Sequence, residues 1–272
     1  MHRPLTLGAA LVLAISAQAE TLTVTDLDVD SIRVLGSVEV EVSQGDSAQL
    51  QIRGDADDLD QKTYPLFYVK DSTLVLGATK SGGSSRFSDL QYRVTLPDLE
   101  ALRLNGSGDI YVKPLQVEDL VVSVSGSGDI KMFSIVADDV SLRVEGSGDL
   151  KVAELDAPVL DMVVSGSGDI AVGELKPDVI EASISGSGDI AVEKSLAQGS
   201  SAEINIIGGG EVDFGQVNFD SAEINIIGSG DARVGELNVL EVNIIGSGDI
   251  YYAGDPEIDS NVLGSGELNR QR

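Results

Sequence analysis

The chain has 272 residues, with 45 Asp and Glu against 18 Lys and Arg, so its formal net charge is −27. A surface this negative argues against binding to nucleic acid or to an anionic membrane, because both need a positive field. The sequence has no cysteine, which excludes disulfides, thiol nucleophiles and cysteine-bound metals. The single histidine, His2, lies in a segment that we expect to be removed.

Residues 1–19 have the pattern of a secretory signal peptide. Arg3 gives a basic start, and the apolar run from Leu5 to Ile15 is too short to span a bilayer as a helix. Small residues precede Glu20, so we predict cleavage after Ala19 and a periplasmic or secreted mature chain. The alternative is a buried N-terminal helix. No later apolar run has the roughly 20 residues of a membrane helix, so we expect no membrane insertion.

Residues 20–104 show irregular strands without a repeat. Apolar and polar residues alternate over 38–42, and again over 48–52 after a turn at Gly45-Asp46. Further strands are predicted around an Asp71-Ser72 turn and over 90–96, before Pro97. The polar segments 55–62 and 77–89 are expected to be a short helical turn or loop and a mobile loop, respectively. We interpret residues 20–104 as atypical coils that cap a repeat.

From residue 105 onward the chain repeats the phrase Gly-Ser-Gly-Asp followed by an aliphatic residue. It begins at Gly106, Gly126, Gly146, Gly166 and Gly186, and returns in looser form at Gly208, Gly228, Gly246 and Gly264. The spacing is 20 residues in the first five copies, and then 22, 20, 18 and 18. Self-similarity at such a period indicates stacked coils of a solenoid.

Aligning the copies places apolar residues in columns with a period of two, which is typical of strands. The positions two and four residues before each motif are apolar in every copy except at Ser260. We therefore predict an all-β, single-domain parallel β-helix with coils of about 20 residues. The hand is expected to be right, as for other parallel crossovers. Each coil is predicted to have two or three short strands, with Leu115, Ile135, Leu155 and Leu175 on a third wall. The continuous domain is expected over 30–268, with its regular part at 105–272.

The repeated Ser-Gly-Ser-Gly-Asp-Ile, as at 125–130 and 165–170, resembles the head GIN domain family of auto-transporter adhesin heads. The opening at 32–46, Ile-Arg-Val-Leu-Gly followed by Val-Glu-Val-Glu-Val-Ser-Gln-Gly-Asp, also resembles that family. The similarity extends over roughly 30–268. It implies a β-solenoid of the bacterial envelope or a secreted one, and it implies no particular activity.

The acidic residues of the motif should stack along one edge. They are Asp109, Asp129, Asp149, Asp169, Asp189, Glu211, Asp231, Asp249 and Glu267. Carboxylates about 5 Å apart repel by about 1 kcal/mol even in water, so the column needs relief. We expect the carboxylates to accept bonds from turn N–H groups. The alternative is a calcium ladder on the seven aspartates, because calcium prefers oxygen ligands. No other cofactor is expected.

An outward stripe of aliphatic residues is predicted one position before the late motifs. It consists of Ile207, Ile227, Ile245 and Leu263, where the earlier copies have Asn, Ser or Glu. An exposed row of this kind indicates a contact with a partner or with a second copy, unless a loop or the C-terminal tail covers it. Beside it runs a column of asparagines, expected to form an amide ladder.

Enzymatic chemistry is the weakest hypothesis. Arg103 and Arg143 share one outward column and Lys131 and Lys151 another, as on β-helix enzymes that cleave acidic polysaccharides. Ordinary surface charge explains them equally, and the mature chain would have no His base and no thiol. Of the Tyr251-Tyr252 pair, which could stack on a sugar, Tyr252 is expected in the core.

These patterns favour a non-enzymatic, extracytoplasmic β-solenoid with an adhesin-like or scaffolding surface. Its partner would be an envelope or extracellular protein or glycan. The alternative is a calcium-stabilised binding module, and the third hypothesis is an enzyme acting on polysaccharide.

Overall fold

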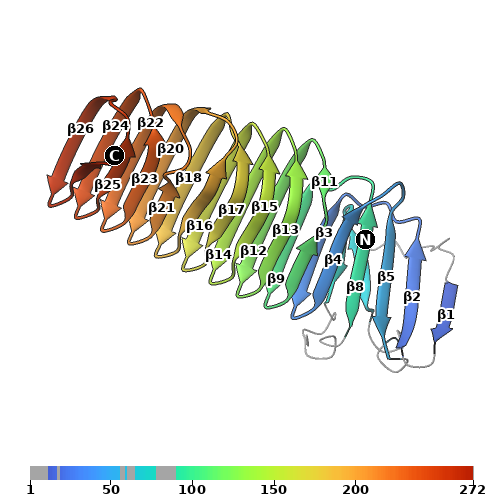
Figure 1. Ribbon diagram of the computed structural model, residues 1–272. Coiled ribbons are helices and arrows are strands. Elements are labelled where there is room, and N and C mark those ends of the chain that lie inside the picture. The colour runs from blue at the N-terminus through green and yellow to red at the C-terminus, as the bar shows by residue number, and fades with distance from the viewer. Residues whose placement is uncertain (1–11, 17–18, 56–58, 60–64, 78–89, 272) are drawn as a thin grey trace.

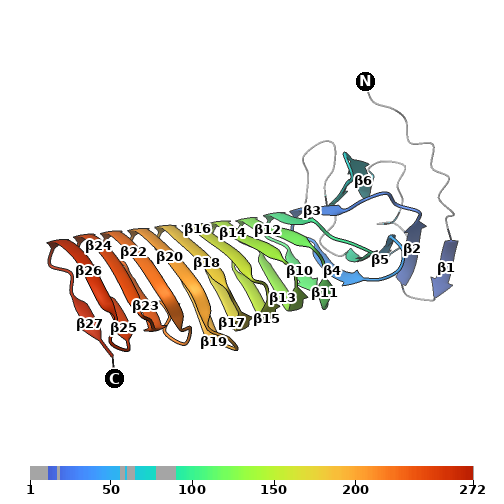
Figure 2. The same cartoon turned by 90° about the horizontal axis from the view of Figure 1, so that it is seen from above.

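The computed structural model describes residues 12–16, 19–55, 59, 65–77 and 90–271. These residues form β-strands and turns, without a helix. Figures 1 and 2 show the coils stacked in one long row, with the C-terminal coil at one end and the N-terminal strands at the other. The predicted parallel β-solenoid is therefore confirmed.

Each regular coil contributes one strand to each of two sheets, which we name sheet A and sheet B. Sheet B, from its C-terminal end, consists of β26 (Glu257–Gly264), β24 (Val239–Gly246), β22 (Phe219–Gly228), β20 (Gly199–Gly208), β18 (Val179–Gly186), β16 (Val159–Gly166), β14 (Asp139–Gly146), β12 (Asp119–Gly126), β9 (Ala101–Gly106), β3 (Ser31–Gly36), β7 (Thr73–Leu76) and β6 (Phe67–Lys70). Its strands are parallel from β26 to β7.

Sheet A is given in the same order and, in the regular coils, consists of the strands that follow the corner motif. It consists of β27 (Leu268–Arg270), β25 (Ile250–Ala253), β23 (Asp231–Glu236), β21 (Glu211–Phe214), β19 (Ile190–Ser195), β17 (Ile170–Lys176), β15 (Leu150–Asp156), β13 (Asp129–Val136), β10 (Asp109–Val112), β4 (Glu39–Gln44), β8 (Gln91–Leu96), β5 (Gln49–Gly54), β2 (Ala19–Thr25) and β1 (Val12–Ser16), with β11 (Leu115–Gln116) paired to β13. The Gly-Ser-Gly-Asp motif forms the corner that leads from sheet B into sheet A. A second edge, which we call the far edge, leads back.

The core lies between the two sheets. Val122 and Val124 of β12, like Ile130 and Met132 of β13, are buried in one continuous apolar cluster. No charged, amide, Ser or Thr side chain is buried among the described residues, so the core is held by apolar burial and the ladders by backbone hydrogen bonds.

The prediction of a third wall is wrong. Ile135 lies on the same strand as Met132, in sheet A, and the two residues between them both face outward. This irregularity recurs in β15 and β17, so each of these three strands buries apolar residues before and after the two outward residues. The third apolar column therefore belongs to sheet A, where it follows two successive outward residues, which we call the outward step.

The N-terminal section combines two coils of the parallel stack, β3 with β4 and β7 with β8, with antiparallel strands. β3 and β4 stack in register on β9 and β10, with Gly36 opposite Gly106. Beyond them, β8 pairs antiparallel with β5, and β5 with β2. β5, the strand that follows the turn at Gly45-Asp46, therefore does not form a hairpin with β4, because β8 lies between them. The Asp71-Ser72 turn is confirmed, with both residues at positive φ between paired strands.

Tyr92 of β8 is a buried aromatic residue within this section. Its hydroxyl donates to the backbone oxygen of Leu66 at 3.2 Å, and burial raises the pKa of that hydroxyl.

The predicted loops at 55–62 and 77–89 fall mainly on residues outside those described. Most of the predicted signal peptide, residues 1–19, also lies outside the described residues, and its described part Val12–Ser16 (β1) pairs antiparallel with β2. No helix of the described residues is long and apolar enough to cross a membrane.

Candidate functional site

The corner of each coil packs backbone directly on backbone. The carbonyl oxygen of Gly146, for example, accepts the N–H groups of Ser167 and Gly168 in the next coil, at 2.8 and 3.1 Å. Gly166 has φ +132°, and a Cβ there would lie 2.3 Å from the Gly146 oxygen. The glycines are thus required by the turn and by the close approach of neighbouring coils.

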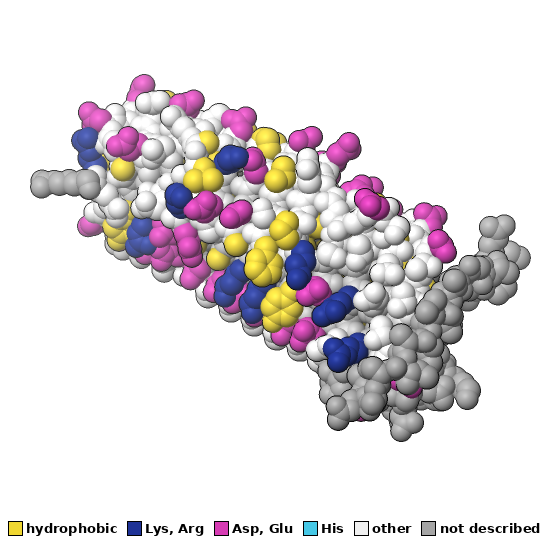
Figure 3. All heavy atoms as spheres, turned by 45° about the vertical axis from the view of Figure 1, so that its right-hand side comes forward, with side chains coloured by type: hydrophobic (Ala, Val, Ile, Leu, Met, Phe, Trp, Pro, Cys, Tyr) yellow, Lys and Arg dark blue, Asp and Glu magenta, His cyan; other side chains and the backbone are white. Residues whose placement is uncertain are grey.

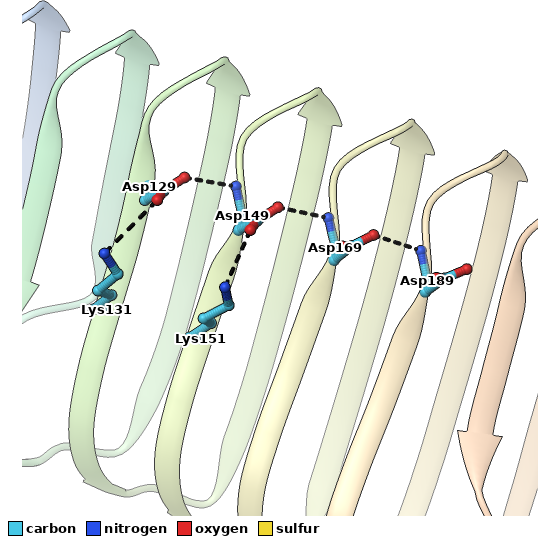
Figure 4. Close-up of polar contacts among 6 residues, drawn as sticks. All are labelled: Asp129, Lys131, Asp149, Lys151, Asp169 and Asp189. Atoms are coloured by element: carbon cyan, nitrogen blue, oxygen red, sulfur yellow. Dashed lines mark hydrogen bonds and ion pairs between the residues drawn. The ribbon is translucent and has the colours of Figure 1, made fainter.

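The acidic column is a hydrogen-bonded ladder (Figure 4). Asp129 Oδ1 accepts the backbone N–H of Asp149 at 3.2 Å, and the pattern continues through Asp169 to Asp189. Asp189, Asp231 and Asp249 accept in the same way from Glu211, Asp249 and Glu267. The prediction of bonding to N–H groups is correct, but each bond runs to the next coil and not within one turn.

Other partners relieve the remaining charge of the ladder. Lys151 pairs with Asp149 at 3.2 Å, and Lys131 lies 3.8 Å from Asp129. Glu211, whose side chain is longer, forms an ion pair with Arg233. Asp109 begins the column, in register with Asp129. Within the described part of the chain, no group of three His, Cys, Asp or Glu is placed to hold a metal ion. The seven predicted calcium ligands therefore stand in a row, with one oxygen of most of them already engaged by protein.

The four residues of the predicted stripe are exposed and adjacent. They occupy the last outward position of β20, β22, β24 and β26, directly before the corner, and are paired in register from coil to coil. The exposed fractions are 55% for Ile207, 50% for Ile227, 50% for Ile245 and 60% for Leu263. We call these four residues the aliphatic stripe.

Two further columns flank the aliphatic stripe on the outer face of sheet B. Asn205, Asn225, Asn243 and Asn261 form the predicted amide ladder, each Nδ2 donating to the preceding Oδ1 at 3.1, 3.2 and 3.5 Å. Two residues before the asparagine on each strand is an acidic residue, and we call this set the acidic face column: Glu203, Glu223, Glu241 and Asp259. This column was missed from the sequence, although it repeats four residues before the stripe.

The opposite face, on sheet A, has a hollow of about 690 Å³. Lys131, Lys151 and Phe133 border it, and small residues such as Ala153 and Gly173 form its floor. On the face shown in Figure 3, hydrophobic and Lys or Arg side chains gather near the middle of the solenoid. Phe133 was missed because it occupies the outward step of β13, where simple alternation fails.

The candidate polysaccharide residues do not converge. Arg103 and Arg143 lie on β9 and β14 of sheet B, whereas Lys131 and Lys151 lie on β13 and β15 of sheet A. Arg143 is engaged by Asp161 at 2.7 Å. Tyr252 packs against the core, and Tyr251 stacks under Arg233, whose guanidinium carbon lies 5.1 Å from the ring centroid.

Fold and surface together define a β-solenoid that presents ladders of identical side chains on flat outer faces. The model of the family described as "Putative auto-transporter adhesin, head GIN domain" matches residues 28–197 and 197–256, and the chain belongs to this family. No curated protein sequence matches it.

Several solved structures are similar over almost their whole length. A structure described as a putative lipid binding protein from Parabacteroides distasonis is 26% identical, with a TM-score of 0.64, covering 94% of this chain and 97% of the other. A putative adhesin from the same organism is 21% identical, with a TM-score of 0.68 and coverages of 93% and 97%. A putative adhesin from Parabacteroides merdae is 22% identical, with a TM-score of 0.67 and coverages of 94% and 97%.

Proposed function

We propose that the protein is an extracytoplasmic, non-enzymatic and adhesin-like β-solenoid that binds an envelope or extracellular partner through the aliphatic stripe. The observation that carries the proposal is the exposure of four aliphatic side chains in one unbroken row. Hydration of exposed aliphatic side chains is unfavourable, so burying the row against a partner lowers the free energy. The pattern of residues 1–19 supports export by a signal peptide cleaved after Ala19.

The family and its solved relatives support the same class of function. Of the three similar structures named above, two are described as a "putative adhesin" and one as a "putative lipid binding protein". The cations proposed for polysaccharide chemistry are divided between two sheets, which argues against an enzyme with a single catalytic centre.

The test replaces Ile207, Ile227 and Ile245 by serine in the mature chain. Capture of a specific component from envelope extract by the wild-type chain should be lost in this variant, while the circular dichroism spectrum and Tm stay unchanged. Light scattering tests whether the partner is a second copy. A wild-type chain that is strictly monomeric and recovers no envelope component would contradict the proposal.

A further inference from the structure

The outer face of sheet B in the late coils carries acids and no bases. β20, β22, β24 and β26 contain six Asp or Glu and no Lys, Arg or His. Between Lys194 and Arg270 the sequence has one Lys or Arg, Arg233, and it lies on sheet A with Glu211. None of the six carboxylates takes part in an ion pair among the described residues.

The acids lie at a fixed distance from the aliphatic stripe. The acidic face column stands four residues before the stripe on each strand, which is about 13 Å along an extended chain. The asparagine ladder lies between them, and Asn205 and Asn225 also donate to Glu203 and Glu223 at 2.9 and 3.1 Å. A hollow of about 320 Å³ is bordered by Glu181, Glu203, Glu223 and Glu241. The face therefore has a fixed layout of one apolar row and one parallel negative row.

This layout disfavours a second copy as the occupant. Two such faces in contact would each bring only negative charge, and like charges about 5 Å apart repel by about 1 kcal/mol per pair even in water. A partner with one apolar row and one cationic row instead covers the aliphatic stripe with its apolar row and meets opposite charge on the acidic face column. From this we infer, on the basis of the proposed function, that the partner presents a basic amphipathic helix, which lies along the aliphatic stripe.

The spacing of the stripe selects a helix over a strand. Neighbouring stripe residues are one strand apart, about 4.8 Å, so the four span about 14 Å. The apolar face of a helix repeats at its pitch of about 5.4 Å, whereas side chains on one face of a strand repeat at about 6.6 Å. Over the three steps of the stripe a helix drifts by about 1.8 Å and a strand by about 5.4 Å, so only the helix keeps its apolar residues against the stripe. A helix of about 10–12 Å diameter that lies over the asparagine ladder, about 6.6 Å from each row, places one flank on the aliphatic stripe and the other on the acidic face column.

The test measures binding of the mature chain to a labelled synthetic peptide by fluorescence anisotropy. The probe is a helix of about 15 residues built from leucine and lysine, with leucine at helical spacing. Two control peptides have every lysine replaced by glutamate, or two central residues replaced by proline. A peptide of alternating lysine and valine serves as the third control and represents a partner that presents a basic strand in place of a helix. We expect the helical probe to bind most tightly, and its affinity to fall as salt rises from about 0.05 to 0.5 M.

Two variants locate the contact on this face. Ile227→Ser should weaken the probe by about five- to tenfold. The triple variant Glu203→Gln, Glu223→Gln and Glu241→Gln should weaken it at least as much. Val159→Ser removes an exposed valine of β16 outside the stripe and should have no effect. The triple variant Glu154→Gln, Glu193→Gln and Glu236→Gln removes equal charge from sheet A and should also leave binding unchanged.

The outcomes separate this inference from the proposed function. The inference of a helical partner would be overturned if the strand, acidic or proline peptide bound more tightly than the helical probe. It would also be overturned if the triple glutamine variants of sheet A and of sheet B weakened the helical probe equally. If the stripe variants still abolish capture from envelope extract, the proposed function stands and only the partner's chemistry is wrong. If neither the probe nor the extract responds to the stripe, both proposals fail.

Discussion

The corner glycines of one coil provide a stringent test of how the solenoid is held together. The motif of this coil is Gly208-Gly209-Gly210-Glu211, so three adjacent positions can each receive the same methyl group. A Cβ at Gly208 would lie 2.2 Å from the Gly186 oxygen, and one at Gly210 would lie 2.2 Å from the Gly188 oxygen. A Cβ at Gly209 would meet nothing within 4 Å. The neighbours in sequence thus differ completely in packing.

The expected costs follow from these contacts. Gly208 also has φ +129°, which an alanine adopts only with strain of about 1–3 kcal/mol. Moving the Gly186 backbone away adds about 1–3 kcal/mol, so Gly208→Ala should cost about 2–6 kcal/mol of unfolding free energy. Gly209→Ala has neither problem and should leave stability unchanged or raise it by up to about 1 kcal/mol, because alanine restricts the unfolded chain.

Urea unfolding followed by far-ultraviolet circular dichroism measures both variants, since the chain has no tryptophan. Gly208→Ala should shift the midpoint strongly, and it should separate the unfolding of coils on its two sides because each coil contacts only its neighbours. Equal midpoints for Gly208→Ala and Gly209→Ala would refute the view that the corners stack backbone on backbone.

Two predictions concern the acidic ladder. Asp169→Ala should lower the unfolding free energy by about 1–2 kcal/mol, because it removes the acceptor of the Asp189 N–H at 2.9 Å. Asp169→Asn keeps an acceptor and should stay within about 0.5 kcal/mol of the wild type in the same urea assay; a loss as large as that of alanine would show that the charge itself is needed. Millimolar calcium should leave the Tm unchanged relative to chelator, because one oxygen of most ladder carboxylates is already hydrogen-bonded to the next coil, and a clear rise would instead support a calcium-stabilised module.

Much of the regular fold could be predicted from the sequence, because the motif repeats and its flanking columns are apolar. Val124 and Ile130 alternate cleanly with outward residues, and period-two alternation fixes which face of a strand is buried. The exposure of Ile207 and Ile227 could be predicted for the same reason. The third wall was wrong because Phe133 and Ser134 both face outward, a local step that alternation does not encode.

The N-terminal pairing and the ladder bonds were less accessible. The insertion of β8 between β4 and β5 is a long-range contact, and nothing local to Gly45-Asp46 shows that the following strand will not pair with the preceding one. The bond from Asp129 to the Asp149 N–H depends on how two coils are offset along the solenoid, which the spacing of 20 residues alone does not determine.

The far edge has a consequence for protein engineering. The corner stays in register through every coil, yet the coil between Gly186 and Gly208 is two residues longer than those before it. Lys194 still pairs 20 positions from Glu174 while Ser201 pairs 22 positions from Val179, so the extra residues lie between these points, at the far edge. The later, shorter coils keep their corners aligned in the same way. Foreign peptide loops could therefore be grafted there, one per coil, and displayed as an array with a repeat of about 4.8 Å.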